Sequence, residues 1–178
     1  MSTAPAIRLS GITKRFGPVV ANDAVDLEVG AGTIHGIIGE NGAGKSTLVS
    51  VLFGFYQADE GSIEMEGERV EIADSADAIR LGVGMVHQHF MLVPTFTVLE
   101  NVMLGAEGGF LLTKGRAATR ADLAQLAADY GLAVDPDALV GDLSVGLQQR
   151  VEILKALRRG ARVLILDEPT GVLTPDET

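Results

Sequence analysis

A glycine-rich loop, set between an apolar run and a helical pattern, constrains the fold of this chain more than any other feature. The apolar run, Thr33 to Ile38, is of the short kind that forms a buried strand. The sequence Gly39-Glu40-Asn41-Gly42-Ala43-Gly44-Lys45-Ser46-Thr47 follows and satisfies the pattern G-x-x-x-x-G-K-S/T. Leu48, Leu52 and Phe55 then recur at helical spacing. A strand, a loop of this kind and a helix, in that order, predict an α/β fold.

The chemistry of this loop predicts a nucleoside triphosphate as its ligand. Glycines allow backbone N–H groups to converge on phosphate oxygens, and a helix N-terminus adds roughly half a positive charge. Lys45 can bridge the terminal phosphates, and Ser46 is expected to ligate Mg2+. The alternative, a glycine-rich turn with an incidental lysine, requires a chance match to a spaced pattern. The predicted nucleotide-binding residues of the loop are Gly39, Asn41, Gly42, Ala43, Gly44, Lys45, Ser46 and Thr47.

Two carboxylates follow a second strand-like run, residues 162–166. Sheets of the α/β class place their ligand crevices at the carboxyl ends of such strands. Asp167 is expected to hold Mg2+ directly or through water, and Glu168 to polarise the water that attacks the γ-phosphate. Taken alone, the sequence Asp-Glu-Pro is also compatible with an ordinary loop after a strand.

The remaining chain suggests one domain, residues 1–178, with a helical subdomain at about residues 90–145. Residues 7–29 alternate polar and apolar side chains, which predicts half-exposed antiparallel strands. Leu147, Val151 and Leu154 share one face of a predicted amphipathic helix. We expect further strands at residues 63–65, 70–72 and 83–87, and helices at residues 76–81, 117–130 and 145–159.

The composition excludes several classes of protein. The chain has 24 acidic and 14 basic residues, a formal net charge of −10, which opposes binding to a nucleic-acid backbone. It has no cysteine, which excludes a disulfide framework and fits a reducing compartment. No apolar run approaches the ~20 residues that span a bilayer, and the first residues lack the apolar core of a secretory signal. A membrane role would therefore require a partner.

A third element, Leu143-Ser144-Val145-Gly146-Leu147-Gln148-Gln149-Arg150, completes a set of motifs that resembles the nucleotide-binding domain of ABC ATPases over the whole chain. The resemblance implies a P-loop NTPase core with an N-terminal antiparallel β subdomain and a helical subdomain. It also implies that a second nucleotide-binding domain presents its ATP to this signature motif, through Leu143, Ser144, Gly146 and Gln148. Ser144 is in addition a good helix N-cap. The commonest family form has glycine in place of Val145 and glutamine in place of Leu147.

Two further site residues come from the resemblance alone. Gln88 matches the family's glutamine that links the metal and the attacking water to the helical subdomain. The resemblance therefore implies three catalytic residues, Lys45, Gln88 and Glu168. It also implies three metal ligands, Ser46, Gln88 and Asp167. Phe16 matches the aromatic residue that stacks on adenine, although a core role is equally open. His87 and His89 flank Gln88, but no other ligands accompany them, which disfavours a metal pair.

Residues 84–105 and 171–175 are similar to the importer branch that handles nucleosides and simple sugars, including Thr174 where most of the family has aspartate. This resemblance implies an ATPase that energises an importer, peripherally at the cytoplasmic face of the inner membrane. Its expected partners are a second nucleotide-binding domain in the same full-length chain, transmembrane permease subunits and, indirectly, an extracytoplasmic solute-binding protein, with no nucleic acid. Residues 90–104 are expected to serve as subdomain core and as a groove for the permease.

The chain stops at Thr178, before the next strand and the switch histidine of the family, so we expect a C-terminally truncated domain that binds ATP with little turnover. The main alternative is a soluble ABC ATPase that acts on nucleic acid or in translation. A non-hydrolysing regulatory half is a third possibility, which the presence of Lys45, Asp167 and Glu168 disfavours.

Overall fold

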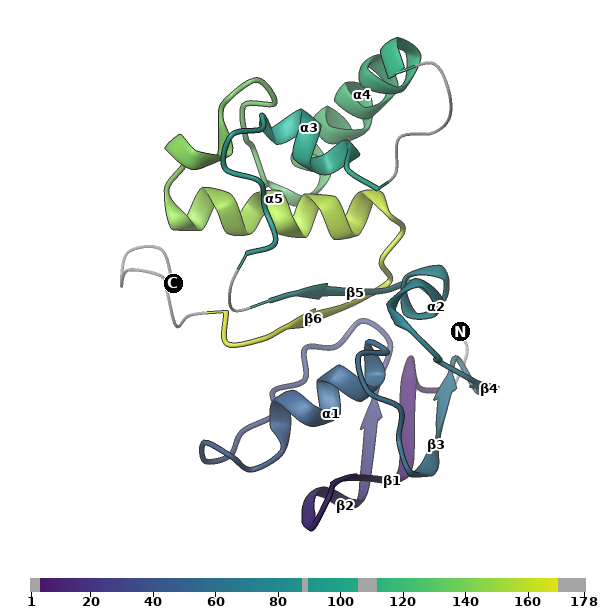
Figure 1. Cartoon of the computed structure of the whole chain (residues 1–178). Coiled ribbons are helices and arrows are strands. Elements are labelled where there is room, and N and C mark those ends of the chain that lie inside the picture. Colours follow the sequence, from purple (N-terminus) through teal and green to yellow (C-terminus); the bar gives the residue numbers. More distant parts are fainter. Residues whose placement is uncertain (1–3, 88–89, 106–111, 170–178) are drawn as a thin grey trace. The chain divides into compact units, whose positions relative to one another are not determined.

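The structure is a computed structural model that describes residues 4–87, 90–105 and 112–169. The chain divides into two units, Met1–Leu81 and Gly82–Thr178 (Figure 1). The first unit carries the glycine-rich loop, and the second carries the acidic segment and the signature motif. The residues predicted to form the candidate site are therefore distributed over both units.

The first unit contains an antiparallel sheet with the strand order β2-β1-β3-β4 (Figure 1). Ile7 and Leu9 are buried on β1, as the alternating pattern predicted, and Ile12 is buried after a register shift between Leu9 and Ile12. The fourth strand starts two residues before the predicted strand at residues 70–72, because a tight turn with positive φ at both Glu66 and Gly67 brings Glu68 opposite Met65. The strands are β1 (Ile7–Phe16), β2 (Val19–Val29), β3 (Glu60–Met65) and β4 (Glu68–Val70).

Two helices complete the described part of the first unit, α1 (Lys45–Leu52) and α2 (Ser75–Arg80). The side chain of Asp74 caps α2 by accepting a hydrogen bond from the Asp77 N–H at 2.9 Å. Phe55, predicted to extend the apolar face of α1, lies beyond the end of the helix and is 49% exposed. The reason is Gly54, whose φ of 82° ends the helix before that position is reached.

The prediction of a buried strand at residues 33–38 is wrong. The segment pairs with none of the described strands, and Ile34 and Ile38 are almost fully exposed. An apolar sequence favours the interior of a sheet. A strand also needs a neighbouring strand, because its N–H and C=O groups must form hydrogen bonds across the pair. No described strand of the first unit pairs with this segment, although it leads directly into the loop.

The second unit combines a parallel strand pair with helices (Figure 1). Strands β5 (Val83–Val86) and β6 (Val163–Leu166), both predicted as strands from their apolar sequences, run parallel. The helices are α3 (Val98–Met103), α4 (Leu112–Tyr130) and α5 (Val145–Arg158), with a short 3-10 helix at Val140–Asp142 before α5. Within the described residues, no helix has a stretch that is both long and apolar enough to cross a bilayer.

The core of the helical part lies between α3, α4 and α5, which contact one another. Val151 and Leu154, on the predicted apolar face of α5, are fully buried there. Leu143 packs against the same core from the residue before the signature serine. The start of α5 is thus held by apolar packing on its helical neighbours. The core residues are Val98, Leu99, Val102, Met103, Leu123, Val140, Val151 and Leu154.

Candidate functional site

The glycine-rich loop leads directly into α1, and two of its glycines have a left-handed backbone conformation. Gly42 and Gly44 have φ values of 84° and 81°, in the left-handed region that favours glycine. Gly44 is the N-cap of α1, and its carbonyl accepts the first bond of the helix from the Leu48 N–H at 2.9 Å. The N–H groups of the first turn have no partner within the helix, so they can bind an anion in front of it.

Lys45 folds its side chain back over the loop. Its Nζ donates hydrogen bonds to the carbonyl oxygens of Gly39 at 2.7 Å and of Glu40 at 2.8 Å. An ammonium group has three donors, so these two bonds leave one for a phosphate oxygen. The lysine therefore joins the two ends of the loop and holds a positive charge at its mouth.

The loop also contacts strand β2 of the same unit. Asn22 Nδ2 donates to the Gly44 carbonyl at 3.1 Å, and the Asn22 side chain is buried. A Cβ atom added to Gly44 would lie 2.1 Å from the carbonyl oxygen of Ala21. Sequence reasoning missed this contact, although a signal was present. Asparagine has a low preference for strands, so its place in an otherwise regular strand pattern suggested a specific role.

Phe16 lies at the end of β1 and is 42% exposed, so it is not a core residue. Its ring centroid is 5.0 Å from that of Tyr56 in an edge-to-face arrangement, and Lys14 Nζ is 5.5 Å from the centroid of Phe16. Asp59 fixes this strand end, since its carboxylate accepts bonds from the Arg15 N–H at 2.6 Å and from Lys14 Nζ at 3.1 Å. Both bonds, and first of all that from Arg15, hold the pKa of Asp59 below its usual value.

The acidic segment continues the parallel strand pair of the second unit. The Asp167 N–H donates to the Val86 carbonyl at 3.0 Å, so Asp167 begins where β6 ends, alongside the end of β5. Glu168 has a φ of 47°, a left-handed conformation that is uncommon and costly for any residue with a side chain. Such strain is found most often at functional sites.

The signature motif forms the start of α5. Ser144 is its N-cap, because its hydroxyl accepts a bond from the Leu147 N–H at 3.4 Å, which confirms the capping role. Gln148 Nε2 donates to the Leu143 carbonyl at 3.0 Å. Gln149 Nε2 donates to the Pro169 carbonyl at 3.1 Å and so connects the signature helix to the acidic segment of the same unit.

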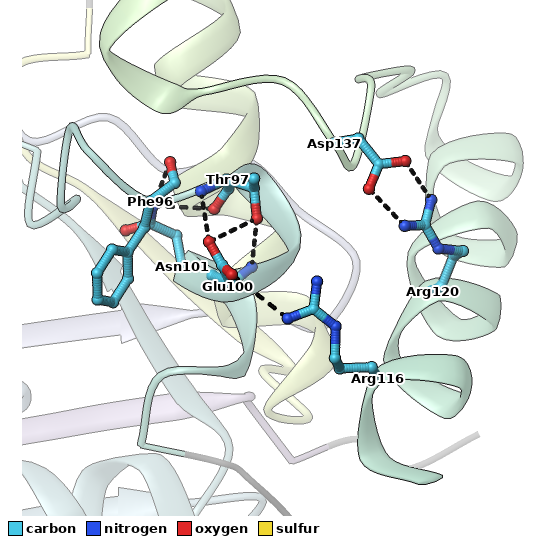
Figure 2. A network of polar contacts seen from close by, with 7 residues as sticks. All are labelled: Phe96, Thr97, Glu100, Asn101, Arg116, Arg120 and Asp137. Carbon is cyan, nitrogen blue, oxygen red and sulfur yellow. Dashed lines mark hydrogen bonds and ion pairs between the residues drawn. The ribbon is translucent and has the colours of Figure 1, made fainter. Parts of the chain in front are cut away.

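A polar network surrounds the start of α3 (Figure 2). Thr97 and Glu100 form a capping box, in which the Glu100 N–H donates to the threonine hydroxyl at 3.2 Å and the Thr97 N–H donates to the glutamate at 3.0 Å. Arg116 on α4 adds a bond to Glu100 at 3.3 Å. The Thr97 N–H first, then its hydroxyl and Arg116, lower the pKa of Glu100.

Several predicted site residues lie outside the described residues. These are Gln88 with its neighbour His89, and residues 171–175, which include Thr174. Within residues 4–87, 90–105 and 112–169, no three histidine, aspartate or glutamate side chains group in a way that could hold a metal ion. Ser46 and Asp167 are oxygen donors, which is the ligand chemistry that Mg2+ prefers.

A family model described as ABC transporter matches residues 22–171. The nucleoside import ATP-binding protein NupA of Lactococcus lactis is 51% identical over 99% of this chain and 35% of its own length. The ribose import ATP-binding protein RbsA 1 of Burkholderia thailandensis is 52% identical over 96% of this chain and 34% of its own length.

A solved ATP-binding cassette of an ABC transporter, in its ADP conformation, matches the fold with a TM-score of 0.83 and 29% identity. The match covers 98% of this chain and 73% of that structure. The chain spans about a third of the length of the curated relatives, 35% and 34%. It spans a larger share of the solved cassette, 73%.

Proposed function

Because the chain belongs to the ABC transporter family, we propose that it supplies the ATP-binding and ATP-hydrolysing part of a membrane importer. The observation that carries the proposal is the loop before α1, where two left-handed glycines, a helix N-terminus and Lys45 come together. Residues 1–178 would form most of one nucleotide-binding domain, with a helical subdomain at about residues 90–145. The import function is supported by the relatives, which are import ATP-binding proteins.

In this proposal the loop binds the triphosphate of ATP. Backbone N–H groups of the loop and of the first turn of α1 would contact the phosphate oxygens, and Lys45 would use its third donor on the terminal phosphates. Phe16 would contribute a ring for adenine, since it is exposed at the end of β1. These groups are positioned before ligand binding by α1 and the β sheet, so little ordering would be required.

Ser46 and Asp167, with Gln88, would hold Mg2+, which neutralises charge on the phosphates when it is bound. Glu168 would accept a hydrogen bond from the water that attacks the γ-phosphorus, while the bond to the β-γ bridging oxygen breaks and ADP leaves. The left-handed backbone of Glu168 supports this role, because it turns the residue sharply out of the direction of β6.

The signature motif would serve the ATP of a second nucleotide-binding domain. Gly146 and the N-cap Ser144 lie at the N-terminus of α5, where free backbone donors and the helix dipole favour an anion. Groups supplied by a second domain can accelerate phosphoryl transfer by roughly 10³-fold to 10⁵-fold. The isolated chain should therefore bind ATP far better than it hydrolyses it.

The transported solute in this proposal is a nucleoside or a simple sugar. Relatives with names for nucleoside and ribose import are 51% and 52% identical, so overall similarity favours neither solute. The complete protein would act at the cytoplasmic face of the inner membrane with permease subunits and, indirectly, a solute-binding protein. The alternative, a soluble ABC ATPase on nucleic acid, is disfavoured by the net charge of −10.

The decisive experiment measures Mg·ATP affinity and ATPase rate of the complete polypeptide with its permease. Lys45→Ala should weaken Mg·ATP binding by about tenfold to a hundredfold, because it removes a charge-assisted hydrogen bond to phosphate. Arg80→Ala, which removes one positive charge from the exposed end of α2 in the same unit, is the matched control and should leave the affinity unchanged. Undiminished affinity in Lys45→Ala would refute the proposal.

A further inference from the structure

We infer that Asn22 on strand β2 is a positioning residue of the phosphate loop, which it holds in its binding conformation through the carbonyl group of Gly44. The inference rests on the proposed ATP-binding function and adds a residue outside the G-x-x-x-x-G-K-S/T motif. It concerns the first unit alone, since β2, the loop and α1 all belong to residues 1–81.

The contact is made at the point where the loop becomes the helix. The carbonyl oxygen of Gly44 accepts two hydrogen bonds, one from Leu48 N–H at 2.9 Å and one from Asn22 Nδ2 at 3.1 Å. A carbonyl has two lone pairs, so this acceptor is fully used. The peptide group that carries the carbonyl also carries the N–H of Lys45, one of the donors at the helix N-terminus. Fixing the carbonyl therefore fixes the direction of that donor.

The backbone of β2 lies very close to the loop at the same position. A Cβ atom on Gly44 would meet the carbonyl oxygen of Ala21 at 2.1 Å and Asn22 Nδ2 at 2.8 Å. By contrast, a Cβ atom on Gly42 would meet nothing within 4 Å. The loop is thus seated on residues 21 and 22 at its C-terminal end and open at Gly42, where a ligand can approach.

An amide side chain at position 22 lowers the stability of the folded state, so stability alone does not explain its presence there. Asn22 is 6% exposed, and its Oδ1 is buried without a hydrogen-bond partner among the described residues. A buried acceptor that lacks a partner destabilises the folded state, and an apolar side chain of similar size would avoid this. The orientation is set by Gly44, since the opposite orientation would direct Oδ1 at another carbonyl oxygen. The functional part of the Asn22 side chain is therefore its NH2 group, which holds the loop through the Gly44 carbonyl.

The test compares variants of the complete polypeptide by calorimetric titration with Mg·ATP and with AMP. Asn22→Leu removes the donor and keeps the approximate size, and it should weaken Mg·ATP binding by about fivefold to tenfold, the effect of one hydrogen bond. Asn22→Asp directs a carboxylate oxygen at the Gly44 carbonyl and should weaken binding more. The loss should be larger for ATP than for AMP, because the loop contacts the terminal phosphates.

Thr13→Val is the matched control. Thr13 is 2% exposed on β1, and its hydroxyl accepts a hydrogen bond from the Ala24 N–H on β2 at 3.0 Å, a bond that does not involve the loop. This variant should lower the unfolding midpoint of the protein while leaving Mg·ATP affinity within about twofold, since no bond to the loop is changed. A merely structural role of Asn22 would make its variants behave like Thr13→Val.

The outcomes separate this inference from the proposed function. Unchanged affinity in Asn22→Leu and Asn22→Asp, together with strongly reduced affinity in Lys45→Ala, overturns the role of Asn22 and leaves the ATP-binding function intact. Equal losses for ATP and AMP also overturn it, because they indicate a general loosening of the unit. Absence of Mg·ATP binding by the unmodified polypeptide refutes the proposed function and the inference together.

Discussion

Asn101 and Val93 exchange two hydrogen bonds: Asn101 Oδ1 accepts from the Val93 N–H at 2.7 Å, and Asn101 Nδ2 donates to the Val93 carbonyl at 3.0 Å. The same NH2 group also donates to the carbonyl oxygens of Thr97 at 3.1 Å and Phe96 at 3.4 Å. One fully buried side chain on α3 thereby closes the turn that precedes the helix. This turn lies within residues 90–104, for which the sequence predicts a groove for the permease, so that prediction depends on the shape of the turn.

Asn101→Leu should destabilise the protein by about 3 kcal/mol, because it leaves the Val93 N–H without its partner and removes the bonds to the carbonyl oxygens of Val93, Phe96 and Thr97. Urea unfolding, monitored by circular dichroism, measures the change. Gln125→Leu removes an exposed hydrogen bond of 2.8 Å to Asp129 on α4 and should cost less than about 0.5 kcal/mol. Equal effects of the two substitutions would contradict the structural role of Asn101.

Glu100 should make the stability depend on pH in the acid range. Its pKa in the folded state is lowered from the ordinary value of 4.5 by the Thr97 N–H, the Thr97 hydroxyl and Arg116. A lowered folded pKa contributes stability above the unfolded pKa, and this contribution is lost as pH falls through the folded pKa. Glu100→Gln should therefore be less stable at neutral pH and show a flatter decline below about pH 4.5.

Thermal unfolding between neutral and acid pH tests this expectation. Arg116→Ala should flatten the decline less than Glu100→Gln does, because the arginine contributes less than the two bonds from Thr97. Parallel curves for Glu100→Gln and the unmodified protein would show that this capping box does not contribute to acid sensitivity.

Gly44→Ala should be much more damaging to stability than Gly42→Ala. Both residues have positive φ, so each substitution adds about 1–2 kcal/mol of backbone strain. Only at Gly44 would the new methyl group also overlap a backbone atom, the Ala21 carbonyl oxygen at 2.1 Å. The expected loss in the free energy of unfolding for Gly44→Ala is at least about 3 kcal/mol. Equilibrium unfolding in urea gives the comparison, and similar losses for both variants would argue against the close approach of β2.

Glu168→Gln should reduce ATP hydrolysis by at least about a hundredfold in the complete transporter, because it removes the proposed acceptor for the attacking water. Mg·ATP affinity should remain nearly the same, since the loop is unchanged. Single-turnover hydrolysis and nucleotide titration measure the two quantities. Glu66→Gln provides the control, because Glu66 is also a glutamate with positive φ but lies in the β3–β4 turn. A full rate in Glu168→Gln would remove Glu168 from the mechanism.

Local patterns were sufficient for a large part of the fold. The period of β1 and β2, the apolar sequences of β5 and β6, and the apolar face of α5 each depend on residues that are close in sequence, so each could be predicted without a structure. The loop could be recognised for the same reason, since its glycines, Lys45 and Ser46 are contiguous. The capping role of Ser144 was likewise local.

Features that depend on distant residues could not be read from these patterns. Residues 33–38 have the composition of a strand, but pairing is a property of two segments, and no described strand pairs with this one. The contact of Asn22 with Gly44 joins residues that are 22 positions apart.

The sequence by itself thus determined the chemistry of the loop, because a phosphate site of this kind is made mostly by consecutive backbone groups. Only the tertiary structure decided what supports that loop and which apolar segments are buried, because packing and hydrogen bonding join residues that no local pattern relates.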